Sequence, residues 1–333
     1  MPLLTVTNLS KSFGGVQAVR EVSFSLQRGE LLALIGPNGA GKSTCFNMLN
    51  GQLRPDSGTV LLEGQDITGH PPRAVWRRGV GRTFQVATTF GSMTVRENVQ
   101  MVLLSRERRL LRLWRRAGDQ YRDQAMALLA RVGMASQAER PCALLAYGDV
   151  KRVELAMALA HEPRLLLMDE PTAGMAPRER NDLMALTAEL TRERGLGVLF
   201  TEHSMDVVFA YAQRMLVLSR GRIIAEGDPA AVRENPEVRA VYLGTGAAFQ
   251  AHAAPAAGVA ARLGAISGRG HGAARARGHV EPSRAPVRAA RLRRRQARRA
   301  RHGARPRAQA AADGRAHGRH GAAGAQRPDG ADC

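Results

Sequence analysis

The residues with the clearest chemical potential are the eight at positions 36–43, GPNGAGKS, which fit the phosphate-loop pattern G-x-x-x-x-G-K-[ST]. Glycines at these spacings let backbone N–H groups converge on phosphate oxygens, because no Cβ stands in the way. Lys42 is expected to reach the β- and γ-phosphates of a nucleotide, and the Ser43 hydroxyl to bind Mg²⁺. The sequence therefore predicts a nucleotide site made of Gly36, Pro37, Asn38, Gly39, Ala40, Gly41, Lys42, Ser43 and Thr44.

The surroundings of this loop support the assignment. An apolar run at 31–35 precedes it and a helical pattern at 42–50 follows, which is the context that a phosphate loop requires. The chain has 49 basic residues but only three lysines, and one of them, Lys42, stands where a compact ammonium is needed. The alternative is a chance glycine-rich turn. It is the weaker interpretation, because the loop lies between a predicted strand and a predicted helix and a second site, which is acidic, follows later in the chain.

That second site is a pair of carboxylates at the end of the apolar run LLLM, residues 165–168. An acid at the end of a buried strand needs a partner, and downstream of a phosphate loop we expect Mg²⁺, bound by Asp169. Glu170 is expected on the other face of the strand end, where it can act as the base that polarises the attacking water. The alternative is a solvent-facing acidic turn before Pro171.

Three further residues are weak signals when taken alone. His203 follows the apolar run 197–201, which places it at the same sheet edge, within reach of the γ-phosphate. Gln85 follows a possible strand at 80–84, and its amide is suited to Mg²⁺ or the attacking water. Phe13 either stacks on adenine or packs in the core, and residue type alone favours the core.

The elements that must position these residues alternate between short apolar runs and amphipathic helical patterns up to residue 244. The runs suit strands buried on both faces of a mostly parallel sheet and lie at 31–35, 165–168, 198–200 and 215–218. Residues 178–192 have helical periodicity. Between 85 and 145 no strand pattern appears, so we predict an inserted helical subdomain at about 86–160, with a helix starting near Val150. The pattern predicts an α/β fold.

The charge is concentrated in the last quarter of the chain. Of the formal net charge of +20, residues 247–333 carry 18 Arg against 4 acids, which leaves +6 for residues 1–246. This Ala/Arg/Gly-rich tail lacks the apolar residues for a core, so we expect disorder. Its arginine-rich stretch at 291–307 could be a nucleic-acid-binding arm. Out-of-frame translation of GC-rich DNA explains the composition better, and we predict neither a function for the tail nor a specific nucleic-acid partner.

Other features limit where the protein can act. The three cysteines, Cys45, Cys142 and Cys333, show no paired or metal-ligand spacing, which indicates a reducing intracellular compartment. The first residues lack the basic segment and apolar core of a signal peptide. No apolar run approaches the ~20 residues of a membrane-spanning helix. Any association with a membrane is therefore expected to occur through a partner.

Together these residues resemble the ATP-binding subunits of ABC transporters, over residues 3–244. The resemblance implies an ABC ATPase domain with the P-loop NTPase fold at 1–246, ATP and Mg²⁺ as cofactors, and hydrolysis of ATP. The roles that it implies are Walker A for 36–43, Walker B for 165–169, catalytic glutamate for Glu170, switch histidine for His203, Q-loop glutamine for Gln85 and adenine stacking for Phe13. The family's LSGGQ signature reads LAYGD at 145–149. Gly148 is kept and is expected to contact ATP in trans, whereas Ala146 replaces the serine.

The LAYGD signature, an AGMAP D-loop at 173–177 and the terminal segment AEGDP…NPEVRAVYLG are similar to the high-affinity branched-chain amino acid uptake subfamily. Its relatives import urea or other amides. The resemblance implies a second ABC ATPase subunit, identical or related, and two transmembrane permease subunits that dock on the helical insert. It also implies a solute-binding protein that acts through the permeases, and a place at the cytoplasmic face of the inner membrane. The competing hypotheses are a soluble ABC ATPase that acts on DNA or ribosomes, and a nucleic-acid-binding protein that depends on its tail.

Overall fold

The computed structural model describes residues 1–83, 89–106 and 121–243. Four predictions fall wholly or partly outside these residues. They are the site residue Gln85, the end of the possible strand at 80–84, part of the helical insert, and the tail at 247–333.

The centre of the fold is a six-stranded sheet in the order β10-β9-β3-β8-β7-β6. Its strands are β3 (Leu31–Ile35), β6 (Val80–Thr83), β7 (Leu165–Asp169), β8 (Gly197–Thr201), β9 (Arg214–Ser219) and β10 (Arg222–Gly227). All neighbours pair in parallel except β9 and β10. The four predicted apolar runs are β3, β7, β8 and β9, and the α/β prediction is confirmed.

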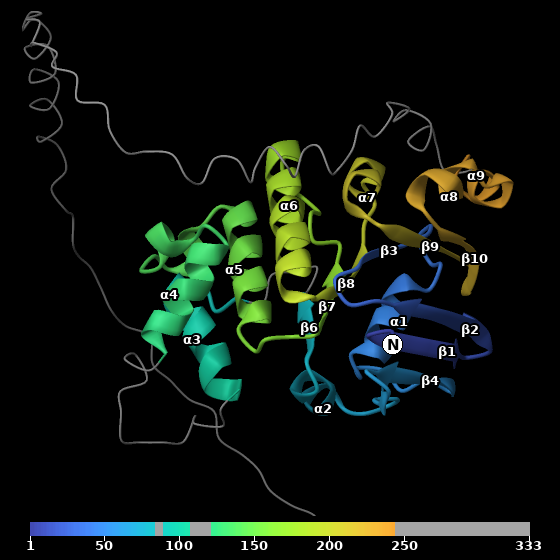
Figure 1. The fold of residues 1–333 in the computed structure, drawn as a ribbon, viewed down its shortest axis with the longest axis horizontal. Helices are drawn as coiled ribbons and strands as arrows, with labels where there is room; N and C mark the ends of the chain where they lie inside the picture. Colours follow the sequence, from blue (N-terminus) through green and yellow to red (C-terminus); the bar gives the residue numbers. More distant parts are fainter. Residues whose placement is uncertain (84–88, 107–120, 244–333) are drawn as a thin grey trace, which may run out of the picture. The chain divides into compact units, whose positions relative to one another are not determined.

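Both faces of this sheet are buried, as its apolar runs indicate. Within β3, Leu31, Ala33 and Ile35 belong to one core cluster. Leu32 and Leu34 belong to the other. The first cluster is covered by helices α5 (Tyr147–Leu159), α6 (Pro177–Arg194) and α7 (Met205–Tyr211), with α8 (Pro229–Glu234) and α9 (Pro236–Leu243) at the β10 end (Figure 1).

The second core cluster lies between the large sheet and a four-stranded antiparallel sheet in the order β2-β1-β4-β5. Its strands are β1 (Leu4–Phe13), β2 (Val16–Leu26), β4 (Ser57–Leu62) and β5 (Gln65–Asp66). Helix α1 (Lys42–Leu49) buries Phe46, Met48 and Leu49 in this cluster, and α2 (Pro72–Arg77) adds Val75. This sheet was not predicted, because strands with one solvent-facing side alternate in polarity and show no continuous apolar run.

The helical insert contains α3 (Val95–Arg106), α4 (Arg122–Arg131) and two short 3₁₀ turns at Ala135–Gln137 and Cys142–Leu144, and α5 packs against α3 and α4 (Figure 1). Within the described part of residues 89–145 there is no strand, only an isolated bridge between Thr94 and Pro141. The predicted start of α5 near Val150 is wrong. The helix begins three residues earlier, at Tyr147, and its N-cap, Ala146, lacks the side-chain acceptor that would mark a helix start in the sequence.

Across residues 1–83, 89–106 and 121–243, no helix combines the length and the apolar character needed to cross a bilayer.

Because β8 lies inside the central sheet, we expect a truncated side chain in this strand to lower the stability of the fold strongly. Leu199 is fully buried in the second core cluster, so Leu199→Ala should lower the free energy of unfolding by about 2–5 kcal/mol. Leu144→Ala is the matched control, because Leu144 is 64% exposed and should change stability by less than about 0.5 kcal/mol. Urea denaturation of the full chain measures both. Equal midpoints for the two variants would contradict the position of Leu199.

Candidate functional site

The phosphate loop connects the end of β3 to the start of α1 and depends on glycine at two positions. Gly36 has φ 156° and Gly41 has φ 107°, conformations that residues with a side chain rarely adopt. A Cβ at Gly36 would clash with the carbonyl of Leu218 in β9, and one at Gly41 with the carbonyl of Ala18 in β2. The loop is therefore held against strands of both sheets, and α1 follows directly with its N-terminal N–H groups at the loop.

Lys42 folds back over this loop. Its Nζ donates to the carbonyl oxygens of Gly36 at 2.7 Å and Pro37 at 3.1 Å, and the residue is only 9% exposed. Burial lowers the pKa of Lys42, whereas the nearby carboxylates of Glu170 and Asp169 raise it. The structure thus brings the loop and the two predicted acids into one electrostatic group.

Asp169 ends β7, and both of its carboxylate oxygens accept hydrogen bonds. The Thr201 hydroxyl donates to Oδ1 at 2.8 Å, and the Arg82 guanidinium donates to Oδ2 at 3.2 Å. Thr201 ends β8 and is the register partner of Asp169 in the parallel ladder. The neighbouring strand therefore provides one of the two groups that orient this carboxylate.

Glu170 lies directly after β7 in a left-handed conformation, with φ 48°. Its backbone N–H donates to the Thr201 hydroxyl at 3.0 Å, and its Oε1 lies 2.8 Å from Nε2 of His203. A positive φ at a residue with a long side chain is strained, and such strain concentrates at functional sites. The structure brings Glu170 and His203 together from the ends of neighbouring strands.

The residues present suit a Mg²⁺ ion bound together with nucleotide. Asp169 supplies carboxylate oxygen, and Ser43, an exposed residue at the start of α1, supplies a hydroxyl. Both are hard oxygen ligands, and Mg²⁺ is usually held by one or two protein groups together with phosphates and water. Among the described residues, no cluster of three or more His, Cys, Asp or Glu side chains could hold a metal ion alone.

Phe13 differs from what its residue type suggested. It ends β1 at a hairpin, is 49% exposed, and has the Nζ of Lys11 at 5.7 Å from its ring centroid. The core interpretation is wrong, because the Gly14-Gly15 turn carries the ring beyond the edge of the core. Stacking on adenine stays a prediction.

The signature segment lies apart from this cluster, since strands of the large sheet separate α5 from α1 (Figure 1). Gly148 is buried in the first turn of α5, and a Cβ there would lie 3.1 Å from the carboxylate of Glu179 in α6. Tyr147 packs against the D-loop at Gly174, where an added Cβ would meet the ring at 3.5 Å. The described residues therefore place Gly148 next to the D-loop and α6 of its own chain.

Several residues of the site were missed by the sequence analysis. Glu202 is 4% exposed and accepts hydrogen bonds from the N–H and hydroxyl of Thr172, at 2.9 and 2.7 Å. Burial raises the pKa of Glu202. Tyr242 in α9 is hydrogen-bonded to the backbone of Gly36, and burial raises the pKa of the Tyr242 phenol. Thr201 and Glu202 directly precede His203 at the end of an apolar run, so their position was a usable signal. Tyr242 has no such local signal.

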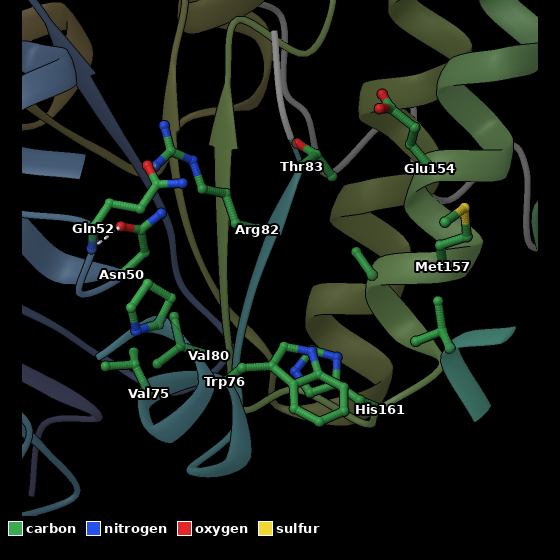
Figure 2. A pocket seen from close by; sticks show the side chains of 13 residues that line it. Asn50, Gln52, Val75, Trp76, Val80, Arg82, Thr83, Glu154, Met157 and His161 are labelled. Carbon is green, nitrogen blue, oxygen red and sulfur yellow. Dashed lines mark hydrogen bonds between the residues drawn. The ribbon is translucent and has the colours of Figure 1, made fainter. Parts of the chain in front are cut away.

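A pocket of about 260 Å³ lies between the β6 edge of the large sheet and the helical insert (Figure 2). Its apolar wall includes Val75, Val102 and Met157. The Trp76 ring stacks on that of His161, with centroids 4.8 Å apart. Burial lowers the pKa of His161 to about 4, so its ring is neutral at pH 7. The pocket also includes polar side chains that Figure 2 labels, namely Asn50, Gln52, Arg82, Thr83 and Glu154.

Comparison with known proteins agrees with this geometry. The family described as "ABC transporter" matches residues 19–173, and "Branched-chain amino acid ATP-binding cassette transporter" matches residues 222–248. A high-affinity branched-chain amino acid transport ATP-binding protein, LivG of Escherichia coli K12, is 40% identical over 250 residues, which cover 73% of this chain and 98% of LivG. The BraF protein of Pseudomonas aeruginosa, which carries the same description, is 37% identical over 253 residues, with 73% and 98% covered.

A solved structure with the same fold is the ADP conformation of MJ1267, described as an ATP-binding cassette of an ABC transporter. It is 32% identical with a TM-score of 0.66, and the match covers 73% of this chain and 99% of MJ1267. With 40% identity to a relative matched over 98% of its length, the chain belongs to the ATP-binding proteins of ABC transporters and is an ATP-hydrolysing member of that family.

Proposed function

We propose that this chain binds MgATP between the 36–43 loop and the Asp169–Glu170 pair and hydrolyses it to energise uptake of branched-chain amino acids or a related small polar solute. The observation that best supports this site is the contact between Oε1 of Glu170 and Nε2 of His203, which are 2.8 Å apart. Beside this contact lie Asp169, oriented by hydrogen bonds, and the buried Lys42. This arrangement supports the proposal of a base, a metal ligand and a phosphate-binding cation at one sheet edge.

In this proposal the residues divide the tasks of hydrolysis among them. The backbone N–H groups of the loop and the ammonium of Lys42 bind the phosphates. Lys42 then contacts phosphate oxygens in place of the carbonyl oxygens of Gly36 and Pro37. Ser43 and Asp169 hold Mg²⁺, which neutralises charge on the transferred phosphoryl group. Glu170 polarises the attacking water, and His203 orients Glu170 and contacts the γ-phosphate. Phe13 stacks on adenine, and Thr44 contacts the α-phosphate. Gln85, which lies outside the described residues, contacts Mg²⁺ or the attacking water.

The solute proposal comes from the relatives. LivG and BraF are described as branched-chain amino acid transport proteins, and the segment at 222–248 matches the corresponding ATP-binding cassette family. An importer of urea or other amides remains the alternative from the same subfamily. A soluble ABC ATPase is less well supported, because the relatives described above are transport proteins.

The proposed partners follow from the position of the signature segment and the pocket. Gly148 lies in the first turn of α5, which packs in the first core cluster, whereas α1 packs in the second. We therefore propose that Gly148 completes the ATP site of a second ABC ATPase subunit, identical or related. We propose that the pocket between β6 and the helical insert docks one of two transmembrane permease subunits, which a solute-binding protein supplies. The chain would then lie at the cytoplasmic face of the inner membrane. The domain at 1–246 suffices for these roles, without nucleic acid.

Replacement of the proposed base gives a direct test. Glu170→Gln should keep ATP affinity but lower the turnover number at least about a hundredfold, because an amide cannot accept the water proton. ATP should then accumulate in the site and shift the subunit to a dimer, measured by light scattering with and without MgATP. Glu189→Gln, in an exposed acid of α6, is the matched control and should behave like the unmodified chain. Normal turnover by Glu170→Gln would show that another group is the base.

The partner proposal is tested with the permease genes expected beside this one. The chain truncated after residue 246 should co-purify with both permeases from mild detergent and hydrolyse ATP at the full-length rate. Met157→Glu places a charge in the apolar wall of the pocket and should abolish co-purification, whereas Ala185→Glu in α6 should not. Loss of ATPase activity on truncation would instead indicate a role for the tail. Failure of the unsubstituted chain to co-purify with the permeases would argue against the transport role.

A further inference from the structure

Arg82 connects three segments that meet at the candidate site. It lies in β6, and its side chain is 11% exposed. NH1 donates to Asn47 Oδ1 in α1 at 2.8 Å and to Gln52 Oε1 at 3.0 Å, and NH2 donates to Asp169 Oδ2 at 3.2 Å. The guanidinium carbon also lies 6.0 Å from the ring centroid of Phe46.

The chemistry of arginine suits this arrangement. The guanidinium is a rigid planar fork, so fixing one nitrogen also fixes the direction of the other. Asn47 and Gln52 hold NH1, and this contact aims NH2 at the carboxylate of Asp169. An arginine side chain is not deprotonated in proteins. The group therefore remains a cation, with its charge opposite a carboxylate.

The Asp169 carboxylate is consequently held from two sides. Thr201 donates to Oδ1 and Arg82 to Oδ2, so rotation of the carboxylate would break one bond or the other. Groups that hydrogen-bond to a metal ligand fix its orientation and raise the affinity of the site for its metal. Both contacts are charge-assisted because the carboxylate is ionised, and the Arg82 guanidinium also places a positive charge next to it.

We infer that Arg82 is a positioning residue of the hydrolytic site, which orients Asp169 to bind the Mg²⁺ of MgATP. The inference rests on the proposed role of Asp169 as a Mg²⁺ ligand. Arg82 and Gln52 also line the pocket next to the helical insert, where Figure 2 shows their side chains beside each other. The group that holds Asp169 therefore forms part of the pocket wall.

The experiment compares Arg82→Met with Arg96→Met in the full chain. Arg96 is a matched control because its side chain is 10% exposed and pairs with Glu139 in the helical insert, away from the site. Three quantities are measured: the Mg²⁺ concentration for half-maximal hydrolysis at saturating ATP, the affinity of the ATP-bound chain for Mn²⁺ by electron paramagnetic resonance, and the affinity for ATP without metal. In Arg82→Met metal affinity should fall about tenfold by both measures, with metal-free ATP binding unchanged. Arg96→Met should leave all three quantities unchanged.

Two further variants separate geometry from charge and protect the test against misfolding. Arg82→Lys keeps the cation but loses the fork, so its metal affinity should also fall. Asn47→Ala leaves Arg82 in place but releases NH1, and a smaller loss of metal affinity is expected; if Arg82→Met does not fold, this variant decides. Unchanged Mn²⁺ affinity in the folded Arg82 variants, or in Asn47→Ala when they do not fold, would overturn the inference. Unchanged affinity in Asp169→Asn would instead overturn the proposed role of Asp169.

Discussion

The buried charge of Lys42 is the constraint on which the rest of the site depends. The charge of a lysine residue that is 9% exposed is stable only if other groups replace its water, and here the carbonyls of Gly36 and Pro37 do so. Asp169 and Glu170 compensate part of the charge from the end of β7. The phosphate loop, α1 and β7 must therefore be held in one fixed arrangement, which the central sheet provides by pairing β3 with β8 and β8 with β7.

The register of the paired strands also determines individual hydrogen bonds of the site. Asp169 and Thr201 are partners in the β7–β8 ladder, and the Thr201 hydroxyl both donates to Asp169 and accepts from the N–H of Glu170. A shift of one residue would turn the Thr201 side chain to the opposite face and remove both bonds. The apolar residues of β7 and β8 are buried on both faces and resist such a shift. Core packing and the geometry of the candidate site thus depend on the same strands.

Local patterns were enough to predict the elements that carry the site. β3, β7, β8 and β9 are continuous apolar runs, and the glycines of the phosphate loop have a spacing that few other structures need. The antiparallel sheet escaped prediction because its strands have one exposed face. The contacts of Arg82 with Asn47 and Asp169 join residues 35 and 87 positions apart, so no local pattern could reveal them. The exposure of Phe13 likewise depends on where β1 ends relative to the core.

The most direct test of this account is ATP binding by the full chain when the buried cation is removed. Titration calorimetry should show that Lys42→Ala raises the dissociation constant for ATP at least about thirtyfold, because loss of one partner from a buried charge pair costs about 2–5 kcal/mol. Arg192→Ala removes an exposed charge from α6 and should bind ATP like the unmodified chain. If Lys42→Ala bound ATP as tightly as the unmodified chain, nucleotide phosphates would have to bind elsewhere, and the account of the site would be wrong.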